Sequence, residues 1–536
     1  MRSQMLIFSK KALLPAIKIL SHGSFPKFAG QFAIQKAYAS LLTPTIRQVL
    51  ANPPKLESEG TARGHIKAIR TFKNVGFIDL SDGSIHETLS VTINNPEDTL
   101  RDNRYKVGQS VEIRGKWIES RGSQPFELSY DPENPTHNIS IIGDVLENYP
   151  IQKKRLTLQF LRTVPTLRHR TSLLASVLRF RAHVEGVLAD FFRENDVVKV
   201  APPLITSSDC EGAGEQFQIR PTNEIQSMSE KSSYPSEKNG AKDADLGFFG
   251  KDAYMTVSTQ LHLEILALSL NRVWTLTPCF RAEDSNTNRH LSEFWMLEAE
   301  LCYVTEVHQL TDFVEAMVRD LVGNLQLEST VLTSGSEHDL LGARFSKQDR
   351  EKIAQTWNQI MGEDKWPSIT YTEAIEILNR VKNKGRLKGR LAWGDLILTE
   401  DEKWLAGVHY NSPVFITDYP KSQKPFYMLQ NEADNTQVSE ETDRATVACF
   451  DLIVPEIGEL VGGSLREHNH EKLVSEMQHR GMLTEAMQWY LSTRENGSVP
   501  HGGFGMGFER LLAYLAAVDN IRDISAFPRA PNVCAC

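Results

Sequence analysis

The sequence predicts an α+β protein in which a small N-terminal β-barrel precedes a larger domain of mixed helices and strands. Two patterns predict this class: short alternating apolar and polar runs fill residues 60–146, and helical periodicity begins near residue 170. At 536 residues the chain is too long for one hydrophobic core, so more than one domain is expected. Its composition, 40% apolar and 24% charged, is typical of globular proteins.

A basic segment, residues 1–45, precedes both domains. The first forty residues carry six Lys or Arg and five Ser, and the first acidic residue is Glu57. Apolar residues around Lys10, Lys11 and Lys18 favour an amphipathic helix. This composition predicts a mitochondrial transit peptide and a location in the mitochondrial matrix, and a disordered basic tail is the alternative. Since no apolar run reaches the ~18 residues that span a bilayer, no membrane insertion is expected.

The charge balance and the cysteines exclude several kinds of site. Loss of the six basic residues of the N-terminal segment takes the net charge from −9 to −15. Nucleic acid would therefore be bound by local basic patches and not by the global field. Six scattered cysteines without a CxxC pair predict neither a disulfide framework nor a zinc site.

The first domain is expected over residues 58–146. About five short strands in fewer than a hundred residues predict a closed five-stranded barrel of the OB type, a frequent binder of oligonucleotides. Arg70, Phe72 and Phe77 would offer it a cation and stacking surfaces for bases. Alternatively, the two phenylalanines belong to the core of the barrel.

A linker, residues 147–168, leads to the second domain, residues 169–536. The segment TSLLASVLRFRAHVEGVLADFFREN predicts a long helix, since its apolar residues have helical spacing: Leu174, Val177, Val184, Leu188 and Phe191. The strand-like run VVKVAPPLIT follows and is stopped by Pro202 and Pro203. Residues 221–245 are polar and aperiodic, which predicts a flexible insertion.

The stretch FRAEDSNTNRHLSEFWMLEAEL, residues 280–301, reads as two strands joined by a polar loop. Alternation along the strands would bring cations, an aromatic ring and carboxylates onto one face. These side chains are Arg281, Glu283, Arg289, His290, Phe294, Glu298 and Glu300. Such a face suits a nucleoside triphosphate together with an amino acid. A charged hairpin exposed to solvent is the alternative.

The stretch HGGFGMGFERLLAYLAA begins at residue 501 with alternating glycines. Gly503, Gly505 and Gly507 remove side chains from one strand face, so that a flat ligand can approach closely. Arg510 falls in the first turn of the helix that follows, where free amides also attract phosphate. The spacing matches neither GxGxxG nor the Walker A loop, and a structural glycine-rich bend is the alternative.

Two further segments carry carboxylates. In FDLIVPEIGELVGGSLRE, Asp451 and Glu459 flank an apolar run and supply the hard oxygen ligands that Mg²⁺ prefers near a polyphosphate. In SSDCEGAGEQF, Glu211 and Glu215 lie on a loop of small residues that could close over a site. Taken singly, these residues read equally well as surface charges and an ordinary loop.

In this order the segments resemble motifs 1, 2 and 3 of the class II aminoacyl-tRNA synthetases. The matching segments are the helix with its Pro-ended strand, FRAE…RHLSEF and GFGMGFER; with the N-terminal barrel they resemble the aspartyl, asparaginyl and lysyl subgroup. VSTQLHLE, WGDL, GVHYNSPVFITDYP, GELVGGSLRE and IRDISAFPR are similar to segments of the asparaginyl enzymes. The resemblance runs from about residue 60 to residue 529.

The resemblance implies a two-step ligase. L-Asparagine and ATP would form asparaginyl-adenylate with release of pyrophosphate, and asparagine would then pass to the 3′-terminal ribose of tRNA(Asn) for mitochondrial translation. Mg²⁺ would assist, and the barrel would contact the anticodon through Arg70, Phe72 and Phe77. Pro203 would mark motif 1, whose helix forms a homodimer interface. The nucleophile is already a carboxylate anion, so positioning and cations supply the catalysis without a general base.

The family also implies roles for the residues that match its motifs. Arg281, Glu283 and Arg510 would be catalytic. In the implied ATP site, Arg281 would bind the α-phosphate and the substrate carboxylate, and Arg289 and His290 would bind the β- and γ-phosphates. Phe294 would stack on one face of adenine, Arg510 would cover the other face and reach the γ-phosphate, and Glu283 would contact the adenine side. Glu459 would contact ATP through the metal. Asp451 and Glu459 would hold Mg²⁺. Glu215 and Gln260 would bind the α-ammonium group.

The choice between asparagine and aspartate would depend on a few side chains. Leu263 stands where aspartyl enzymes carry a lysine that binds the substrate carboxylate. Glu298 would accept from the amide NH₂ of asparagine and Arg466 would donate to its carbonyl, so that aspartate meets a like charge. Such a site can discriminate by ~10⁴. The sequence departs from the family at Leu465, usually Gln, and like other asparaginyl enzymes it has Gly462 where aspartyl relatives have a metal-binding Ser.

Two other functions stay open from the sequence. The chain could be an aspartyl-tRNA synthetase, including a non-discriminating one. It could also be a non-catalytic paralogue that binds RNA, although such a paralogue is expected to have lost Arg281 or Arg510, and both are present.

Overall fold

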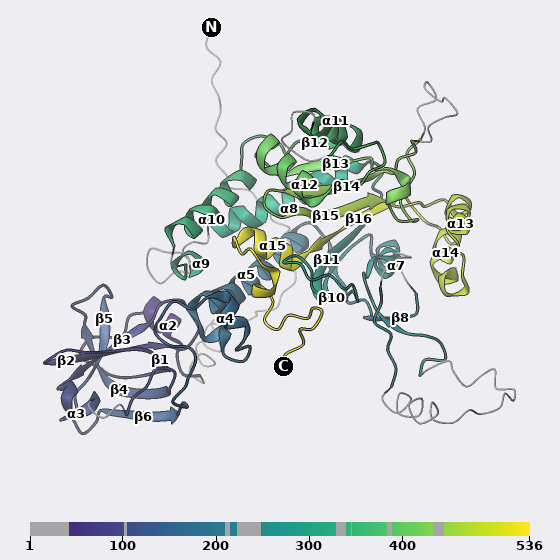
Figure 1. The fold of residues 1–536 in the computed structure, drawn as a ribbon. Helices are drawn as coiled ribbons and strands as arrows, with labels where there is room; N and C mark the ends of the chain where they lie inside the picture. The colour runs from purple at the N-terminus through teal and green to yellow at the C-terminus, as the bar shows by residue number, and fades with distance from the viewer. Residues whose placement is uncertain are drawn as a thin grey trace, which may run out of the picture.

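The structure is a computed structural model that describes residues 42–100, 104–208, 215–221, 248–327, 339–344, 346–382, 389–432 and 444–536. It confirms the predicted α+β class, with a barrel sheet of six strands and a mixed sheet of eight. Figure 1 shows the barrel at one end of the molecule and the larger sheet, with its helices, at the other. The predicted transit peptide lies outside the described residues except for 42–45, and the predicted insertion except for 221.

The N-terminal barrel is built from strands whose alternate side chains fill one core. They are β1 (Glu59–Thr71), β2 (Val75–Ser81), β3 (Leu89–Asn94), β4 (Ser110–Glu119), β5 (Phe126–Tyr130) and β6 (Asn138–Gly143), with α2 (Ile46–Ala51) and α3 (Pro96–Leu100) beside them. The order β1-β2-β3-β5-β4 closes through the β1–β4 pair. The sheet thus has six strands where about five were predicted. β5 and β6 share one edge of β4: β5 pairs with residues 116–119 and β6 with residues 110–114.

The larger domain surrounds an eight-stranded sheet. Its strands, in spatial order, are β12 (Ser368–Thr370), β13 (Val414–Thr417), β14 (Cys449–Val454), β15 (Gly458–Leu465), β16 (His501–Gly507), β11 (Glu293–Cys302), β10 (Arg272–Phe280) and β7 (Val198–Lys199). Only the outermost pairs, β12 with β13 and β7 with β10, are parallel. A separate two-stranded pair joins β8 (Ile205–Thr206) to β9 (Tyr254–Met255).

Helices cover both faces of this sheet. The main core packs four helices on one face: α5 (Ser172–Glu194), α8 (Val307–Leu327), α10 (Lys347–Ile360) and α15 (Phe508–Leu515). Two of the remaining helices pack on the other face: α7 (Gln260–Leu270) against β10 and β11, and α11 (Tyr371–Lys382) against β13 and β14. α9 (Asp339–Gly342) adjoins the main core through Leu340, and α4 (Leu158–Arg162) packs against the start of α5. The others are α12 (Thr399–Trp404), α13 (His470–His479) and α14 (Gln488–Glu495). Short helical turns complete the fold: η1 (Arg168–Arg170), η3 (Leu405–Tyr410), η4 (Lys421–Gln423), η5 (Glu485–Met487) and η6 (Ile521–Asp523).

The long helix predicted near residue 170 is α5. The hydroxyl of Thr171 accepts from the backbone N–H of Leu174 and caps its start, and the helix ends at Glu194 before Asn195. All five apolar residues predicted from the spacing are buried on it. The Pro-containing run after α5 forms only β7 and β8, because Pro202 and Pro203 separate them and cannot donate ladder hydrogen bonds. No helix of the described residues is long and apolar enough to cross a membrane.

A buried carboxylate of the larger domain, Asp339, contacts the barrel. Asp339, at the start of α9, accepts from the backbone N–H of His86 on the barrel at 2.7 Å and from Arg179 Nε of α5 at 2.7 Å. Arg179 also donates to the carbonyl of Gly83 on the barrel. Burial alone would raise the pKa of Asp339, but the hydrogen bonds from His86 and Arg179 lower it to about 2. The barrel is therefore attached through a charge-assisted contact.

Candidate active site

One face of the large sheet brings the predicted site residues into rows that cross the strands. Asp451 pairs with Gly462, Gly462 with Gly505, and Gly505 with Glu298, so these four residues form one row over four strands. Directly opposed residues of antiparallel strands point to the same face. The two predicted ends of the site, Asp451 and Glu298, therefore share a face although 153 positions separate them in the sequence.

The alternating glycines keep this face clear of side chains. A Cβ at Gly503 would collide with Oε2 of Glu300, and a Cβ at Gly505 would lie 3.1 Å from Sδ of Met296. Phe504 and Met506, between the glycines, are buried in the core on the opposite face. The predicted stripped strand is therefore confirmed, and backbone forms the floor of the site.

The stretch at residues 280–301 forms the predicted pair of strands, β10 and β11, joined by a loop. The guanidinium of Arg281 lies 5.6 Å from the ring centre of Phe294, and Nη1 lies 4.0 Å from Oε1 of Glu283. Further along β11, Glu298 and Glu300 are buried. A hairpin exposed to solvent is excluded by this burial.

Three predicted basic residues gather at one end of the site. Arg510, in the first turn of α15, donates to the carbonyl of Glu459 at 3.3 Å. Arg289 Nη1 donates to Oγ1 of Thr399 at 2.5 Å. Burial lowers the pKa of His290, and the positive charge of Arg510 lowers it further. Both effects favour the neutral imidazole, whose Nδ1 lies 2.6 Å from Oγ1 of Thr287 and 3.1 Å from Oγ of Ser285.

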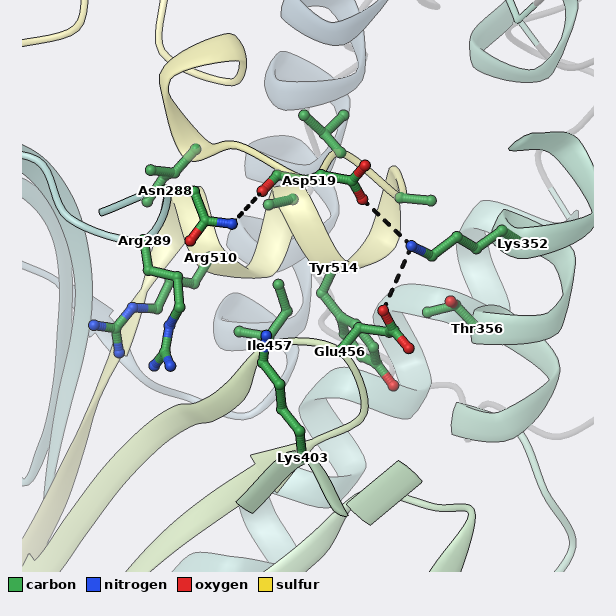
Figure 2. A pocket seen from close by; sticks show the side chains of 14 residues that line it. Asn288, Arg289, Lys352, Thr356, Lys403, Glu456, Ile457, Arg510, Tyr514 and Asp519 are labelled. Atoms are coloured by element: carbon green, nitrogen blue, oxygen red, sulfur yellow. Dashed lines mark hydrogen bonds and ion pairs between the residues drawn. The ribbon is translucent and has the colours of Figure 1, made fainter. Parts of the chain in front are cut away.

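Arg289 and Arg510 also line a pocket of about 260 Å³ behind this end of the site. Figure 2 shows both guanidinium groups on one side of the pocket and Lys352 on the other, where it contacts Glu456 at 3.6 Å and Asp519 at 3.4 Å. Lys403 lines the pocket as well. This residue was not predicted, because nothing in the sequence of α12 distinguishes it from a surface lysine. The pocket adds positive charge to the end of the site where the resemblance predicts phosphates.

The predicted metal ligands converge above Gly462. A Cβ at Gly462 would lie 3.4 Å from Oδ1 of Asp451 and 3.5 Å from Oε1 of Glu459. Glu402 of α12 is a third carboxylate nearby, and its Oε2 accepts from the backbone N–H of Glu459 at 3.2 Å. Burial, together with the negative charge of Glu459, raises the pKa of Glu402 to about 7. Such a cluster of carboxylate oxygens fits a hard divalent cation.

Lys424 balances part of this negative charge. Its Nζ donates to Oδ1 and Oδ2 of Asp451 at 2.9 and 2.7 Å. Burial would lower the pKa of Lys424, but Asp451 holds it above its usual range. Glu402 and Lys424 lie outside the motifs, so the sequence did not reveal their place in the site.

Glu298 is engaged by the start of α7. One oxygen accepts from the hydroxyl of Ser258, the other from the hydroxyl of Thr259, and the backbone N–H of Thr259 lies 3.0 and 3.2 Å from the two oxygens. Burial raises the pKa of this carboxyl, and these hydrogen bonds oppose the rise. The predicted acceptor for a ligand amide therefore already holds the Ser258–Thr259 turn, and an amide would share its oxygens with these donors.

The two residues predicted for the α-ammonium group lie on different segments. Gln260 is the first residue of α7, and its Nε2 donates to Oε1 of Glu264 at 3.1 Å. Glu215 is exposed, and its carbonyl accepts from the backbone N–H of Ala282 at 2.7 Å. Glu215 is therefore next to the strand end that carries Arg281. Glu211, on the same loop, lies outside the described residues.

Arg466 is buried at the end of β15. Its Nε and Nη2 donate to the two oxygens of Glu300 at 3.1 and 2.9 Å, and its Nη1 donates to Oγ of Ser464 at 2.6 Å. The planar fork is thus fixed by a bidentate pair, which leaves part of its donor capacity for a ligand. Arg466, which is predicted to donate to the side-chain carbonyl of the substrate, is therefore held in one orientation without a substrate.

Behind Arg466 lies a group of buried polar residues that was not predicted. Oε2 of Glu264 accepts from Arg494 at 2.6 Å and from the hydroxyl of Tyr490 at 2.7 Å, and it lies 3.2 Å from Nε2 of His501. Glu264, Glu300 and His501 have the spacing of a metal site. However, Arg466 and Arg494 already neutralise the two carboxylates, so these residues do not suit a cation.

The two leucines noted in the sequence do not reach this group. Leu263 is buried beneath α7 with Ala267 and Val273. Leu465 is buried in the main core, on the opposite face of the sheet from Arg466. The replacement of the usual Gln by Leu465 therefore leaves the face of the site unchanged.

The three residues predicted to contact the anticodon gather on one side of the barrel. The ring of Phe72 is 58% exposed and makes an edge contact with Phe77 at 6.0 Å between centroids. The guanidinium of Arg70 lies 5.3 Å from the centre of the Phe77 ring. The alternative that both phenylalanines belong to the core is excluded by the exposure of Phe72.

Comparison with known proteins identifies the family of this chain. The family model for class II tRNA synthetases (D, K and N) matches residues 158–531. The mitochondrial asparagine–tRNA ligase of Saccharomyces cerevisiae is 44% identical over 87% of this chain and 91% of its own length. The mitochondrial enzyme of Schizosaccharomyces pombe is 37% identical over 87% and 93%, and the enzyme of Clostridium tetani is 36% identical over 91% and 98%.

A solved structure is similar over nearly the whole chain. Asparaginyl-tRNA synthetase from Pyrococcus horikoshii, complexed with asparaginyl-adenylate, superposes with a TM-score of 0.73 at 25% identity and covers 92% of this chain and 100% of its own. With the family model and the relatives above, this likeness agrees with the barrel and the large sheet. The chain therefore belongs to the class II tRNA synthetases of the D, K and N family, and within it to the asparagine–tRNA ligases.

Proposed function

We propose that the chain ligates L-asparagine to tRNA(Asn) in two steps, through asparaginyl-adenylate. The observation that carries this proposal is the single sheet face that joins the Asp451–Glu459 carboxylates to Glu298 and Arg466 over a floor of glycine backbone. An amino acid can lie at one end of this face and a triphosphate at the other. The sequence similarity to asparagine–tRNA ligases supports asparagine as the amino acid.

Positioning and positive charge would do the chemical work. The α-carboxylate of asparagine attacks the α-phosphorus of ATP, an O–P bond forms, and the bond to the leaving pyrophosphate breaks. Arg281 would hold the attacking carboxylate and the α-phosphate together, and Glu283 would contact the adenine. Because the nucleophile is already anionic and the leaving group is stabilised by cations, no proton has to move in this step.

The remaining ATP contacts would come from both sides of the nucleotide. Phe294 would stack on one face of adenine, next to the guanidinium of Arg281. Arg510 would cover the other face and reach the γ-phosphate, and Arg289 would bind the β- and γ-phosphates with neutral His290 as a hydrogen-bond donor. The cationic pocket behind Arg289 and Arg510 supports this orientation of the triphosphate.

Asp451 and Glu459 would hold Mg²⁺, and Glu402 completes a set of three nearby carboxylates. When bound, the ion would neutralise charge on the phosphate oxygens as the leaving group develops. The pKa of Glu402, raised to about 7 in a group of like charges, supports a site that gains from a divalent cation. Lys424 would then share Asp451 with the ion and keep this carboxylate oriented.

Asparagine would be bound at its two ends by different residues. Gln260 and Glu215 would take the α-ammonium group, Glu298 would accept from the side-chain NH₂, and Arg466 would donate to the side-chain carbonyl. Aspartate would place a carboxylate against buried Glu298, and the resulting repulsion disfavours it.

ATP–pyrophosphate exchange with asparagine and with aspartate tests the proposal. We expect exchange with asparagine, little with aspartate, and charging of a tRNA(Asn) transcript. Equal exchange with both amino acids would indicate a non-discriminating aspartyl enzyme. Binding of tRNA without exchange by any amino acid would indicate a non-catalytic RNA-binding paralogue, although Arg281 and Arg510 are both present in the site.

Three further parts of the proposal have their own supports. The barrel would bind the anticodon through Arg70, Phe72 and Phe77, and replacing exposed Phe72 with Ala should raise the KM for tRNA without changing exchange. Two chains would form a homodimer through motif 1. Sedimentation of the purified protein measures whether it is a dimer. The N-terminal basic segment and the mitochondrial relatives support a location in the mitochondrial matrix.

A further inference from the structure

A group of buried polar residues surrounds Arg466, and we call it the buried charge cluster. All of its members are buried, with at most 6% of any residue exposed: Glu264, Glu300, Arg466, Tyr490, Arg494 and His501. They come from α7, β11, the end of β15, α14 and the start of β16. Residues so far apart in the sequence and so well paired indicate a built site and not incidental surface charge.

Glu264 touches the residues proposed for both ends of the amino acid. Its Oε1 accepts from Nε2 of Gln260, which is proposed for the α-ammonium group, at 3.1 Å. The same oxygen lies 3.9 Å from Nε of Arg466, which is proposed for the side-chain carbonyl. Its Oε2 accepts from Arg494 and Tyr490. One buried carboxylate therefore hydrogen-bonds the residue proposed for one end of the amino acid and forms an ion pair with the residue proposed for the other end.

The formal charges of the buried charge cluster cancel. Arg466 and Arg494 contribute two positive charges, and Glu264 and Glu300 contribute two negative charges. Burial alone would raise the pKa of Glu264, but Arg494 and His501 hold it well below its usual range. Burial raises the pKa of Glu300, and the bidentate contact with Arg466 opposes this rise and favours the ionised form. A ligand beside Arg466 thus meets oriented N–H donors without a net positive charge.

We propose that Glu264 is a specificity-determining residue, which cancels the charge behind Arg466 so that the site prefers a neutral carboxamide to a carboxylate. The inference rests on the proposed ligation of asparagine. In a buried site, a cluster with a net positive charge would attract a carboxylate strongly. A guanidinium whose charge is balanced by nearby carboxylates instead offers hydrogen bonds to a neutral carbonyl. Glu264 therefore acts through Gln260 and Arg466 and does not itself touch the substrate.

Two single substitutions separate the charge of Glu264 from its shape. Glu264→Gln keeps the size of the side chain and removes its charge, which leaves one uncompensated positive charge in the cluster. We expect the ratio of kcat/KM for asparagine to that for aspartate, measured by ATP–pyrophosphate exchange, to fall at least tenfold. Glu264→Asp keeps the charge and shortens the reach to Gln260. It should raise the KM for asparagine and keep the ratio within about threefold.

A double substitution that restores neutrality controls for a loss of stability in the single variant. In Glu264→Gln the guanidinium of Arg494 loses its carboxylate partner, so the single variant is expected to unfold at a lower temperature. Adding Arg494→Met removes that second charge and returns the cluster to neutrality. We expect the double variant to recover most of the preference for asparagine, and Tyr490→Phe, which removes a neutral hydrogen bond to the same oxygen, to keep it.

Each outcome decides a different point. An unchanged ratio in Glu264→Gln, or no recovery in the double variant, would overturn the role of Glu264. Where the single variant is poorly folded, the ratio in the folded double variant decides: a strong preference for asparagine supports charge neutrality, and its loss refutes it. If the unsubstituted protein activates no asparagine, the proposed function fails, whatever Glu264 does.

Discussion

Replacing Glu298 with Gln tests whether this buried carboxylate selects the side chain of the amino acid. Its oxygens accept from Ser258, from the Thr259 hydroxyl and from the Thr259 backbone N–H at 3.0 Å. Gln keeps the size and one acceptor oxygen, and the rotating Ser258 hydroxyl can accept from the new NH₂. The turn at the start of α7 should therefore survive, so that the change acts mainly on charge.

The expected size follows from the contacts. A hydrogen bond to a charged group is stronger than a neutral one by about 1 kcal/mol, so the KM for asparagine should rise ~5-fold to ~10-fold. A substrate carboxylate ~4 Å from Glu298 would be repelled by ~4 kcal/mol at an effective dielectric constant of about 20. Removal of that repulsion should improve aspartate by as much as ~10³-fold. Together these changes would remove most of the preference for asparagine.

The assay is ATP–pyrophosphate exchange with both amino acids, using the unsubstituted protein and Glu298→Gln in parallel. Thermal unfolding of both proteins controls for a general loss of structure. If the KM for asparagine and the preference over aspartate both stay unchanged, the reasoning is refuted. Glu298 would then serve only to hold Ser258 and Thr259 in place.

Other parts of the molecule carry four further predictions. Arg510→Ala should raise the KM for ATP at least 30-fold in exchange, from the loss of ~2 kcal/mol of charge-assisted binding, while the KM for asparagine stays within about threefold; equal changes in both would contradict its place at the triphosphate. Asp451→Asn should weaken Mn²⁺ binding at least tenfold by electron paramagnetic resonance, and unchanged binding would remove Asp451 from the metal site. Because the pKa of Asp339 is lowered to about 2, its contribution of ~2 kcal/mol is present above pH 4 and lost as the pH falls towards 2. Asp339→Asn should therefore lower stability at pH 7 and flatten acid unfolding in that window, followed by circular dichroism, and a parallel pH profile would refute the contact. Residues 1–45 fused to a fluorescent reporter should direct it to mitochondria, and a cytosolic reporter would contradict the predicted transit peptide.

The sequence predicted those features that local pattern determines. The spacing of apolar residues in α5 placed a buried helix correctly, because a period of 3.6 residues has one physical reading over a span this long. The alternating glycines of β16 likewise predicted a bare strand face, since a strand presents every second residue to one side. Arg281 and Arg510 were singled out from local pattern, and the order of the motifs, which resembles a known family, implied their roles.

Pairings between distant segments were beyond the reach of these patterns. Glu264, Arg494 and His501 lie up to 237 positions apart, and each alone reads as an ordinary helix or strand residue. Lys424 and Glu402 belong to segments without motif residues, and only the fold brings them to Asp451 and Glu459. The barrel has six strands where about five were predicted, because β5 and β6 share one edge of β4, and only the fold shows that sharing.

The row from Asp451 through Gly462 and Gly505 to Glu298 sets the distance between the two ends of the ligand site. Three steps between neighbouring strands, each about 4.8 Å, separate its ends by about 14 Å. Backbone hydrogen bonds set this length, so side-chain substitutions can change what is held at each end but not how far apart the ends are. A ligand analogue should therefore tolerate changes of its terminal groups more readily than a linker that is one atom longer or shorter.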